Sequence, residues 1–361
     1  MTSRERILSA LRSEKTDHIP LLGGFIVSSK HYCEIGGISR SLFFGDPARH
    51  ALEAYRALGV DGLILLRLPA RKTGISEFRN MSASGFFSYA KRYRSPEDVL
   101  AHVDSLPSPP EALERFDLNS WRRQLADGLR DMQERTGEIV WMPTQWDIVH
   151  PSFEFYNVFG YENYLEFLVR YPEAADRFFG STVEVKRAIS SIIVEVYQEL
   201  EIVPLIHIGT DICGKSGPVV SPRFLKERFF PHVRRSVEPL VDAGFKLVWH
   251  SDGVILPIVD DLLDCGIAGF QGFQWEYGID LAAIASRRTK TGEKVILFAG
   301  PSVSSTLPFG SRQDVREEIE HIIDSASDSC ILFFLPANDI LPDTPTGNVV
   351  EAYTHAREYG G

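Results

Sequence analysis

Eight short apolar runs alternate with segments of helical character along this chain of 361 residues, and the alternation restricts the possible folds more than any other feature. The runs cover residues 18–25, 62–68, 138–144, 204–211, 245–252, 268–274, 295–302 and 330–338. Continuous apolar runs are typical of parallel strands that are buried on both faces. The sequence therefore predicts an α/β fold, specifically a (β/α)8 TIM barrel.

Helix signals between the runs support this prediction. Ser221 stands where the N-cap of a helix is expected before the fifth run, and Pro231 and Pro239 predict that this helical segment is kinked or broken. Residues 1–15 predict a further, N-terminal amphipathic helix with Ser3 as its N-cap.

The interval between the second and third runs is too long for a single crossover. We expect residues 69–136 to form an insertion, with a hairpin over residues 75–93 followed by additional helices. A doubly wound open sheet is the alternative fold, although no G-x-G-x-x-G motif follows the first run. No low-complexity linker divides the chain, so residues 1–361 are expected to form a single domain.

Charge and composition exclude several classes of partner. Acidic residues outnumber basic ones, 49 to 38, and the formal net charge is −11, so no nucleic-acid partner is expected. No stretch of 18 apolar residues predicts a membrane span. The four cysteines form no CxxC pair, which is typical of reduced thiols in the cytoplasm. We expect a cytoplasmic protein that acts on a small molecule, with a homodimer as a candidate assembly.

Polar side chains follow several of the runs. Active sites of (β/α)8 barrels lie at the carboxyl ends of the strands, so these side chains are expected to meet at one rim. The candidate residues at this rim are Asp61, Gln145, His207, Asp211, Gln274, Glu276 and Asn338.

His250 and Asp252 end the fifth run, two residues apart. Residues i and i+2 of a strand face the same side, so both side chains could point into the mouth of a barrel. There they could bind a metal, with Glu276, Cys213 or His207 as a third ligand, or act as an acid/base pair. Alternatively, Asp252 caps the following helix and His250 is a core residue.

Four segments in order resemble the uroporphyrinogen decarboxylase superfamily. They are "RERILSALRSEKTDHIP" near the start, "GPVVSPRFLKERFFPHVRRSVEPLVDAG", "HSDG" at the end of the fifth run, and "ILPDTPTGNVVEA" near the end. The resemblance covers nearly the whole chain and is weakest over residues 69–136. It implies a (β/α)8 barrel, in agreement with the eight runs.

The chain departs from the decarboxylases of this superfamily. These enzymes bind the acidic side chains of a tetrapyrrole with arginines that follow the first strand, where residues 23–37 of this chain offer Lys30 and no arginine. The resemblance places the family's aspartate at Asp61 and its tyrosine at Tyr156, as substrate-binding residues, whereas its histidine is replaced by Asn338. True uroporphyrinogen decarboxylation is therefore not expected.

The corrinoid-dependent methyltransferases of the superfamily hold zinc with an HxC motif and a distant cysteine. Here the motif reads His250-Ser251-Asp252, and Asn338 stands at the distant position. Oxygen ligands in place of thiolates would make a bound metal a harder Lewis acid. We expect transfer of a methyl group from a small methylated or methoxylated compound to a corrinoid carried by a partner protein. His250, Asp252 and Asp211 would be catalytic, and His250, Asp252 and Glu276 are candidate zinc ligands.

Two alternatives to methyl transfer remain. The first is cofactor-independent decarboxylation of a smaller acid, in which Asp61 or Asp211 stabilises a protonated intermediate and His250 donates a proton. The second is a non-catalytic binding barrel, against which the polar rim argues, because buried polar groups without a function are costly to keep.

Overall fold

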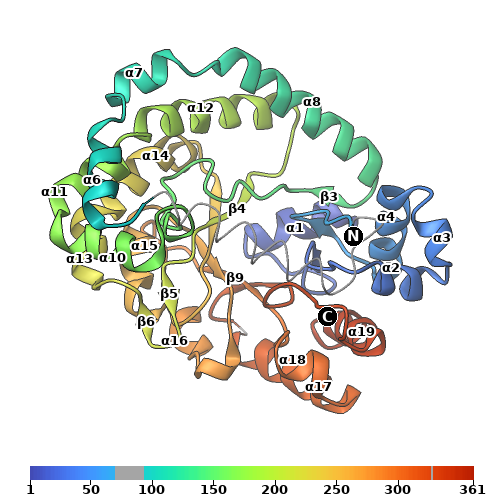
Figure 1. Cartoon of the computed structure of the whole chain (residues 1–361). Coiled ribbons are helices and arrows are strands. Elements are labelled where there is room, and N and C mark those ends of the chain that lie inside the picture. The colour runs from blue at the N-terminus through green and yellow to red at the C-terminus, as the bar shows by residue number, and fades with distance from the viewer. Residues whose placement is uncertain (70–92, 327) are drawn as a thin grey trace.

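The computed structural model describes residues 1–69, 93–326 and 328–361, and in it parallel strands are surrounded by helices (Figure 1). One sheet has three strands in the order β1-β2-β3, and a second has five in the order β10-β9-β8-β7-β4. Each strand lies within one of the predicted runs, which confirms the α/β class. The strands are β1 (Leu22–Gly23), β2 (Gly62–Leu63), β3 (Val140–Trp141), β4 (Leu205–Gly209), β7 (Lys246–His250), β8 (Gly269–Gln271), β9 (Ile296–Ala299) and β10 (Ile331–Phe334).

Backbone contacts join the edges of the two sheets. The Gln145 N–H donates to the carbonyl of His207 over 2.8 Å, which places the end of β3 beside β4. The Phe334 N–H donates to the carbonyl of Pro20 over 2.9 Å, and Leu21 forms an isolated parallel bridge with Phe334, which places β10 beside β1. Because all of these pairings are parallel, the carboxyl ends of the strands lie on the same side of the molecule.

The strands are buried on both faces, which explains their continuous apolar sequence. In β7, Val248 belongs to a small core that also contains Ile7 of helix α1 (Ser3–Leu11), whereas Leu247 and Trp249 belong to the large core beneath the outer helices. Successive residues of a strand point to opposite faces, so His250 shares the inner face with Val248. The strand thus directs the histidine side chain inward.

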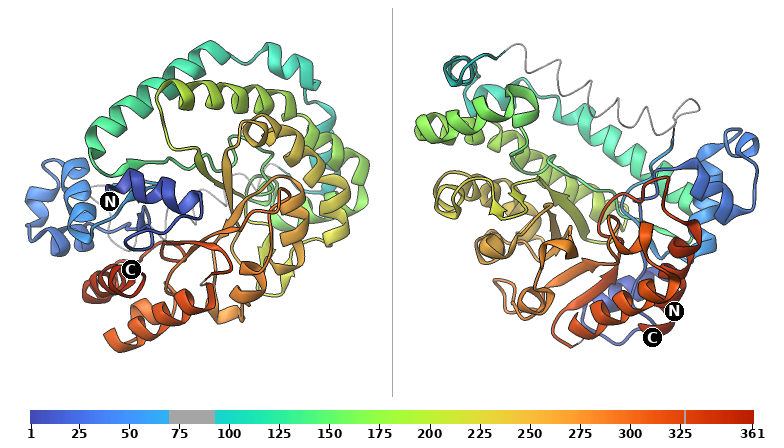
Figure 2. Two further views of the ribbon diagram at one scale, coloured as in Figure 1. Left: turned by 180° about the vertical axis from the view of Figure 1, so that it is seen from behind. Right: turned by 60° about the horizontal axis from the view of Figure 1, so that its bottom comes forward.

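The outer helices follow the strands in chain order, and Figure 2 shows them around the sheets from two further directions. They are α2 (Ser29–Gly36), α3 (Arg40–Phe43), α4 (Pro47–Leu58), α9 (Tyr156–Phe159), α10 (Tyr161–Arg170), α11 (Pro172–Gly180), α12 (Val183–Glu199), α13 (Pro222–Arg228), α14 (Phe230–Asp242), α15 (Val259–Asp264), α16 (Leu281–Ala285), α17 (Thr306–Phe309), α18 (Arg312–Ala326) and α19 (Thr346–Tyr359). Two short 3-10 helices, η1 (Leu256–Ile258) and η2 (Trp275–Tyr277), follow β7 and β8, and a small antiparallel hairpin, β5 (Cys213–Gly214) and β6 (Gly217–Pro218), follows β4. None of the described helices is both long and apolar enough to cross a bilayer.

The helix ends confirm most of the sequence signals. The helix before β7 is broken at Phe229, with Pro231 in the first turn of α14 and Pro239 inside it, as predicted. The N-cap of α1 is Thr2, so the prediction of Ser3 was wrong by one residue. Thr2 fits better because Glu5 completes a capping box with it.

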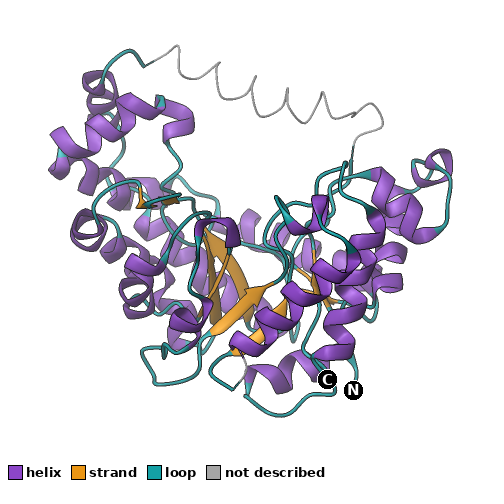
Figure 3. Ribbon diagram, turned by 90° about the horizontal axis from the view of Figure 1, so that it is seen from below, coloured by secondary structure: helices purple, strands orange, loops and turns teal. Residues whose placement is uncertain are grey.

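In its described part, residues 93–136, the predicted insertion contains the helices α6 (Pro96–Asp104), α7 (Pro109–Glu114) and α8 (Leu118–Thr136). The additional helices expected there are therefore confirmed, while the hairpin predicted for residues 75–93 falls almost entirely on residues that are not described. Figure 3 shows the strands in the centre and the two chain termini side by side. A hydrogen bond from the Ile19 N–H to the Gly360 carbonyl, 2.9 Å long, agrees with that placement.

Candidate active site

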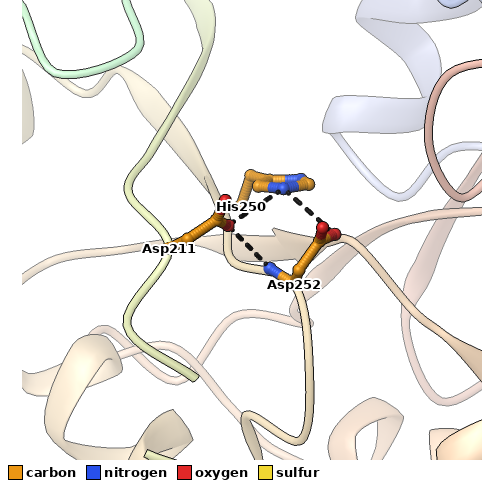
Figure 4. A group of neighbouring side chains, drawn as sticks. All are labelled: Asp211, His250 and Asp252. Atoms are coloured by element: carbon orange, nitrogen blue, oxygen red, sulfur yellow. Dashed lines mark hydrogen bonds and ion pairs between the residues drawn. The ribbon is translucent and has the colours of Figure 1, made fainter. Parts of the chain in front are cut away.

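Three side chains with metal-ligand chemistry meet at the carboxyl ends of β4 and β7 (Figure 4). Asp211 follows β4, His250 ends β7, and Asp252 comes two residues later. His250 Nε2 lies 3.5 Å from Asp211 Oδ1 and 3.5 Å from Asp252 Oδ1. One ligand atom from each of the three lies within 4.8 Å of the others, and no other such group occurs among the described residues. We call these three residues the Asp–His–Asp group.

The two strands approach closely at this group because one of them carries a glycine. Gly209 pairs in register with His250, and a Cβ at Gly209 would lie 2.4 Å from the His250 carbonyl oxygen. Any other residue would push β4 away from β7. The glycine thereby keeps Asp211, two residues further on, within reach of the imidazole.

Hydrogen bonds fix the carboxylate of Asp252. The side-chain amide of Asn338 donates to both of its oxygens, over 3.0 and 3.2 Å, and the Asp252 N–H donates to Asp211 Oδ1 over 2.9 Å. The next residue, Gly253, donates its N–H to Gln274 Oε1 over 2.8 Å. Asp252 does not cap a helix, so that interpretation of the sequence was wrong: Ile255 stands at the N-cap of η1.

A series of buried, hydrogen-bonded side chains fixes the imidazole ring of His250. Gln271 is fully buried, and its Nε2 donates to the Ala337 carbonyl over 2.8 Å, so its Oε1 must face the two histidines. That oxygen accepts from His250 Nδ1, and from His207 Nε2 over 3.3 Å. The hydroxyl of Thr144 lies 2.9 Å from the other nitrogen of His207. Because Gln271 accepts the Nδ1 proton, the lone pair that His250 would offer to a metal is the one on Nε2, on the side of the two aspartates.

The negative charges of Asp211 and Asp252 favour a positive charge, either a proton or a metal ion, at His250 Nε2. Burial by itself lowers the pKa of His250, but hydrogen bonds and charges from Asp211 and Asp252 outweigh it and raise the pKa to about 10. In the opposite direction, burial lowers the pKa of His207 to about 3, helped by the charge of His250, so His207 is neutral. A site that attracts a proton this strongly also suits a metal ion, which competes for the same lone pair.

Four of the predicted substrate-binding residues lie around the Asp–His–Asp group. His207, Gln274 and Asn338 contact the group or its immediate supports, as described above. Tyr156, at the start of α9, is also near: burial raises the pKa of its hydroxyl, and the charges of Asp211 and Asp252 raise it further. These four were predicted as substrate-binding residues, and the structure brings them together around the Asp–His–Asp group.

Asp61 lies elsewhere. It precedes β2 and therefore sits at the amino end of the strands, where it is 2% exposed. It forms an ion pair with Arg6 of α1 and accepts the Leu21 N–H over 2.9 Å. The expectation that Asp61 contributes to the site is corrected, because its position before the strand puts it at the opposite end from the Asp–His–Asp group.

Gln145 and Glu276 are not part of the group either. Gln145 is buried and interacts with Tyr197 of α12, one of the outer helices. Glu276 is exposed on η2 and accepts hydrogen bonds from Ser302 and Ser304 in the loop after β9. It therefore supplies none of the ligand atoms that converge on His250.

Gln271, Trp146 and Glu154 also lie around the group and were given no role in the sequence prediction. Gln271 lies inside the predicted run 268–274 and ends β8, so its place beside the group could have been inferred. Trp146, whose ring lies 5.0 Å from that of His250, and Glu154, which binds Trp146, belong to an aromatic stretch after β3 that carries no distinguishing signal.

Comparison with known proteins agrees with the fold. A family model described as uroporphyrinogen decarboxylase (URO-D) matches residues 155–359. A solved structure, a methyltransferase from Methanosarcina mazei, is similar with a TM-score of 0.64 over 99% of this chain and 98% of that chain, at 16% sequence identity. Comparison with curated protein sequences finds no match. Because the family model covers more than half of the sequence, the chain belongs to the URO-D family.

Proposed function

We propose that this member of the URO-D family is a metal-dependent methyltransferase. It would move a methyl group from a small methylated or methoxylated compound to a corrinoid carried by a partner protein. The observation that carries the proposal is the Asp–His–Asp group at the carboxyl ends of the strands. We further propose that the strands form a closed (β/α)8 barrel within a single domain of residues 1–361, so that the group lies at the mouth of the barrel.

The geometry of the group fits a zinc ion or a similar divalent cation. Zinc bonds to nitrogen and oxygen are about 2.0–2.1 Å long, so two ligands of a tetrahedral site are roughly 3.3 Å apart. The two distances of 3.5 Å from His250 Nε2 to the aspartate oxygens are close to this value. A metal held by Asp211, His250 and Asp252 would supply Lewis-acid chemistry, and the all-oxygen-and-nitrogen donor set favours oxygen-containing substrates over thiols.

Two features argue against a tetrapyrrole substrate. Lys30 donates to the backbone carbonyls of Pro342 and Thr344, over 3.2 and 3.3 Å, and therefore holds the loop after β10 in place. Figure 4 shows the carboxylates of Asp211 and Asp252 on either side of His250, so an acidic substrate bound at this group would meet two negative charges. The similar structure from Methanosarcina mazei is that of a methyltransferase, which agrees with the proposed reaction.

The proposal is tested by assaying methyl transfer to free reduced cobalamin, which stands in for the partner protein. The purified protein is stripped of metal with a chelator and reloaded with zinc, and methylcobalamin formation is followed by absorbance with a panel of methoxylated and methylated compounds. Transfer that requires zinc supports the proposal. Absence of transfer by zinc-loaded protein from every compound in the panel refutes it.

One observation favours a second candidate. Without a metal, His250 is an imidazolium between two carboxylates, which suits a proton donor in cofactor-independent decarboxylation of a small acid. Protein that is purified without metal, does not take up zinc, and releases carbon dioxide from a small acid would support this alternative.

Replacing Gln271 with leucine, which has a similar size, is expected to weaken zinc binding by about 10- to 100-fold. Leucine cannot accept the Nδ1 proton of His250, so the ring loses the partner that directs its lone pair at the metal. Affinity is measured by competition with a chelating dye. The matched control is Gln313→Leu on the exposed surface of α18, and equal affinities of the two variants would contradict the role of Gln271.

A further inference from the structure

A fourth carboxylate lies beside the Asp–His–Asp group without belonging to it. Trp146 Nε1 and the Thr210 hydroxyl both donate to one oxygen of Glu154, Oε2, over 3.0 and 3.2 Å. Within the described residues, the other oxygen, Oε1, accepts no hydrogen bond from the protein. The side chain is therefore fixed through one oxygen, and the other is available.

The two donors connect Glu154 to the loops that build the site. Thr210 immediately precedes Asp211, and its N–H donates to the His250 carbonyl over 3.2 Å. The ring of Trp146 lies 5.0 Å from the ring of His250, at an angle of 45°. A single intervening residue therefore links Glu154 to each of two members of the group, namely Thr210 to Asp211 and Trp146 to His250.

The surroundings of Glu154 favour its protonated form. Burial raises the pKa of Glu154, and neighbouring negative charges raise it further, although its two hydrogen bonds act in the opposite direction. A buried carboxyl group that is oriented through one oxygen and favours its protonated form is suited to donate a proton.

We propose that Glu154 is the general acid of the reaction, which gives its proton to the leaving oxygen of a methyl ether. This inference rests on the proposed methyltransferase function and narrows the substrate to compounds that carry the methyl group on oxygen. A phenol has a pKa of about 10, so its anion is a poor leaving group at neutral pH without a proton donor.

The step balances with a reduced corrinoid as methyl acceptor. The bond between the methyl carbon and the ether oxygen breaks, and its electron pair stays on the oxygen. The electron pair of Co(I) forms the new bond to the methyl carbon, so cobalt is formally oxidised to Co(III). The oxygen takes the proton from Glu154, and the product leaves as an alcohol or phenol. Solvent then protonates the carboxylate again.

The test compares Glu154→Gln with wild type on two methyl ethers, methoxybenzene and 4-nitromethoxybenzene, with zinc-loaded protein and free reduced cobalamin. Glutamine keeps an acceptor oxygen for Trp146 and Thr210 but has no acidic proton. We expect kcat for methoxybenzene to fall by at least about 100-fold. For the nitro compound, kcat should fall by less than about 10-fold. Its phenolate is less basic, so it leaves readily without a proton from Glu154. Zinc affinity and Tm should not change.

Equal losses on both ethers, no loss on either, or weakened zinc binding in Glu154→Gln would overturn the assignment of a general acid. Glu162→Gln, on the exposed surface of α10, is the matched control and should behave as wild type. Wild-type protein that demethylates neither these ethers nor any compound of the panel overturns the proposed function itself. Wild-type protein that uses thioethers or methylated amines but no ethers overturns only the role of Glu154.

Discussion

Replacing His250 with alanine is expected to reduce the affinity of the protein for zinc by at least about 100-fold, more than the loss of an outer hydrogen-bond partner. The variant retains two carboxylates but loses the nitrogen whose lone pair Gln271 directs toward them. Two carboxylates alone do not select a borderline ion such as zinc. Methyl transfer should disappear with the metal. Zinc content after dialysis and dye-competition titration measure the effect.

Two controls make this result specific. His355→Ala removes a histidine that pairs with Glu320 on the outer surface, 2.9 Å away, and should leave zinc binding unchanged. Asp252→Asn should also weaken zinc binding, since the carboxylate charge is lost at the same position. If His250→Ala binds zinc as tightly as wild type, the Asp–His–Asp group is not the metal site.

Replacing Asp61 with alanine is expected to lower the free energy of unfolding by about 3–5 kcal/mol, because the change leaves the buried guanidinium of Arg6 without its buried partner. Asp61 and Arg6 are 2% and 7% exposed, and the Leu21 N–H also loses its acceptor. Zinc affinity should not change, since Asp61 lies at the opposite end of the strands. Urea denaturation and dye competition measure the two quantities.

Asp17 provides a matched control within the same contact. It also pairs with Arg6, over 2.6 Å, but its side chain is 44% exposed. Asp17→Ala should therefore cost about 1 kcal/mol or less. A stable Asp61→Ala protein that loses activity would instead restore Asp61 as a substrate-binding residue and contradict the structural role.

The fold and the centre of the site could be predicted from local patterns. Parallel strands buried on both faces have a recognisable sequence, and the rule that i and i+2 share a face placed His250 and Asp252 together. Asp61 was misplaced because a shift of a few residues decides which end of a strand a side chain occupies. Helix and strand boundaries are the least certain part of any sequence pattern.

The rest of the site depends on contacts that local patterns do not encode. Glu154 reaches Trp146 and Thr210 only because the loop after β3 folds back over the end of β4. The orientation of the Gln271 amide depends on the carbonyl of Ala337, which is 66 residues away in the chain. Such pairings appear only once the tertiary structure brings the loops together.

The hydrogen bonds between Asn338 and Asp252 couple the two positions. The Asn338 amide donates to both carboxylate oxygens of Asp252, so each side chain holds the other in place. A cysteine at either position alone would remove that contact. The effects of substitutions at the two positions on zinc affinity are therefore expected to be epistatic rather than additive.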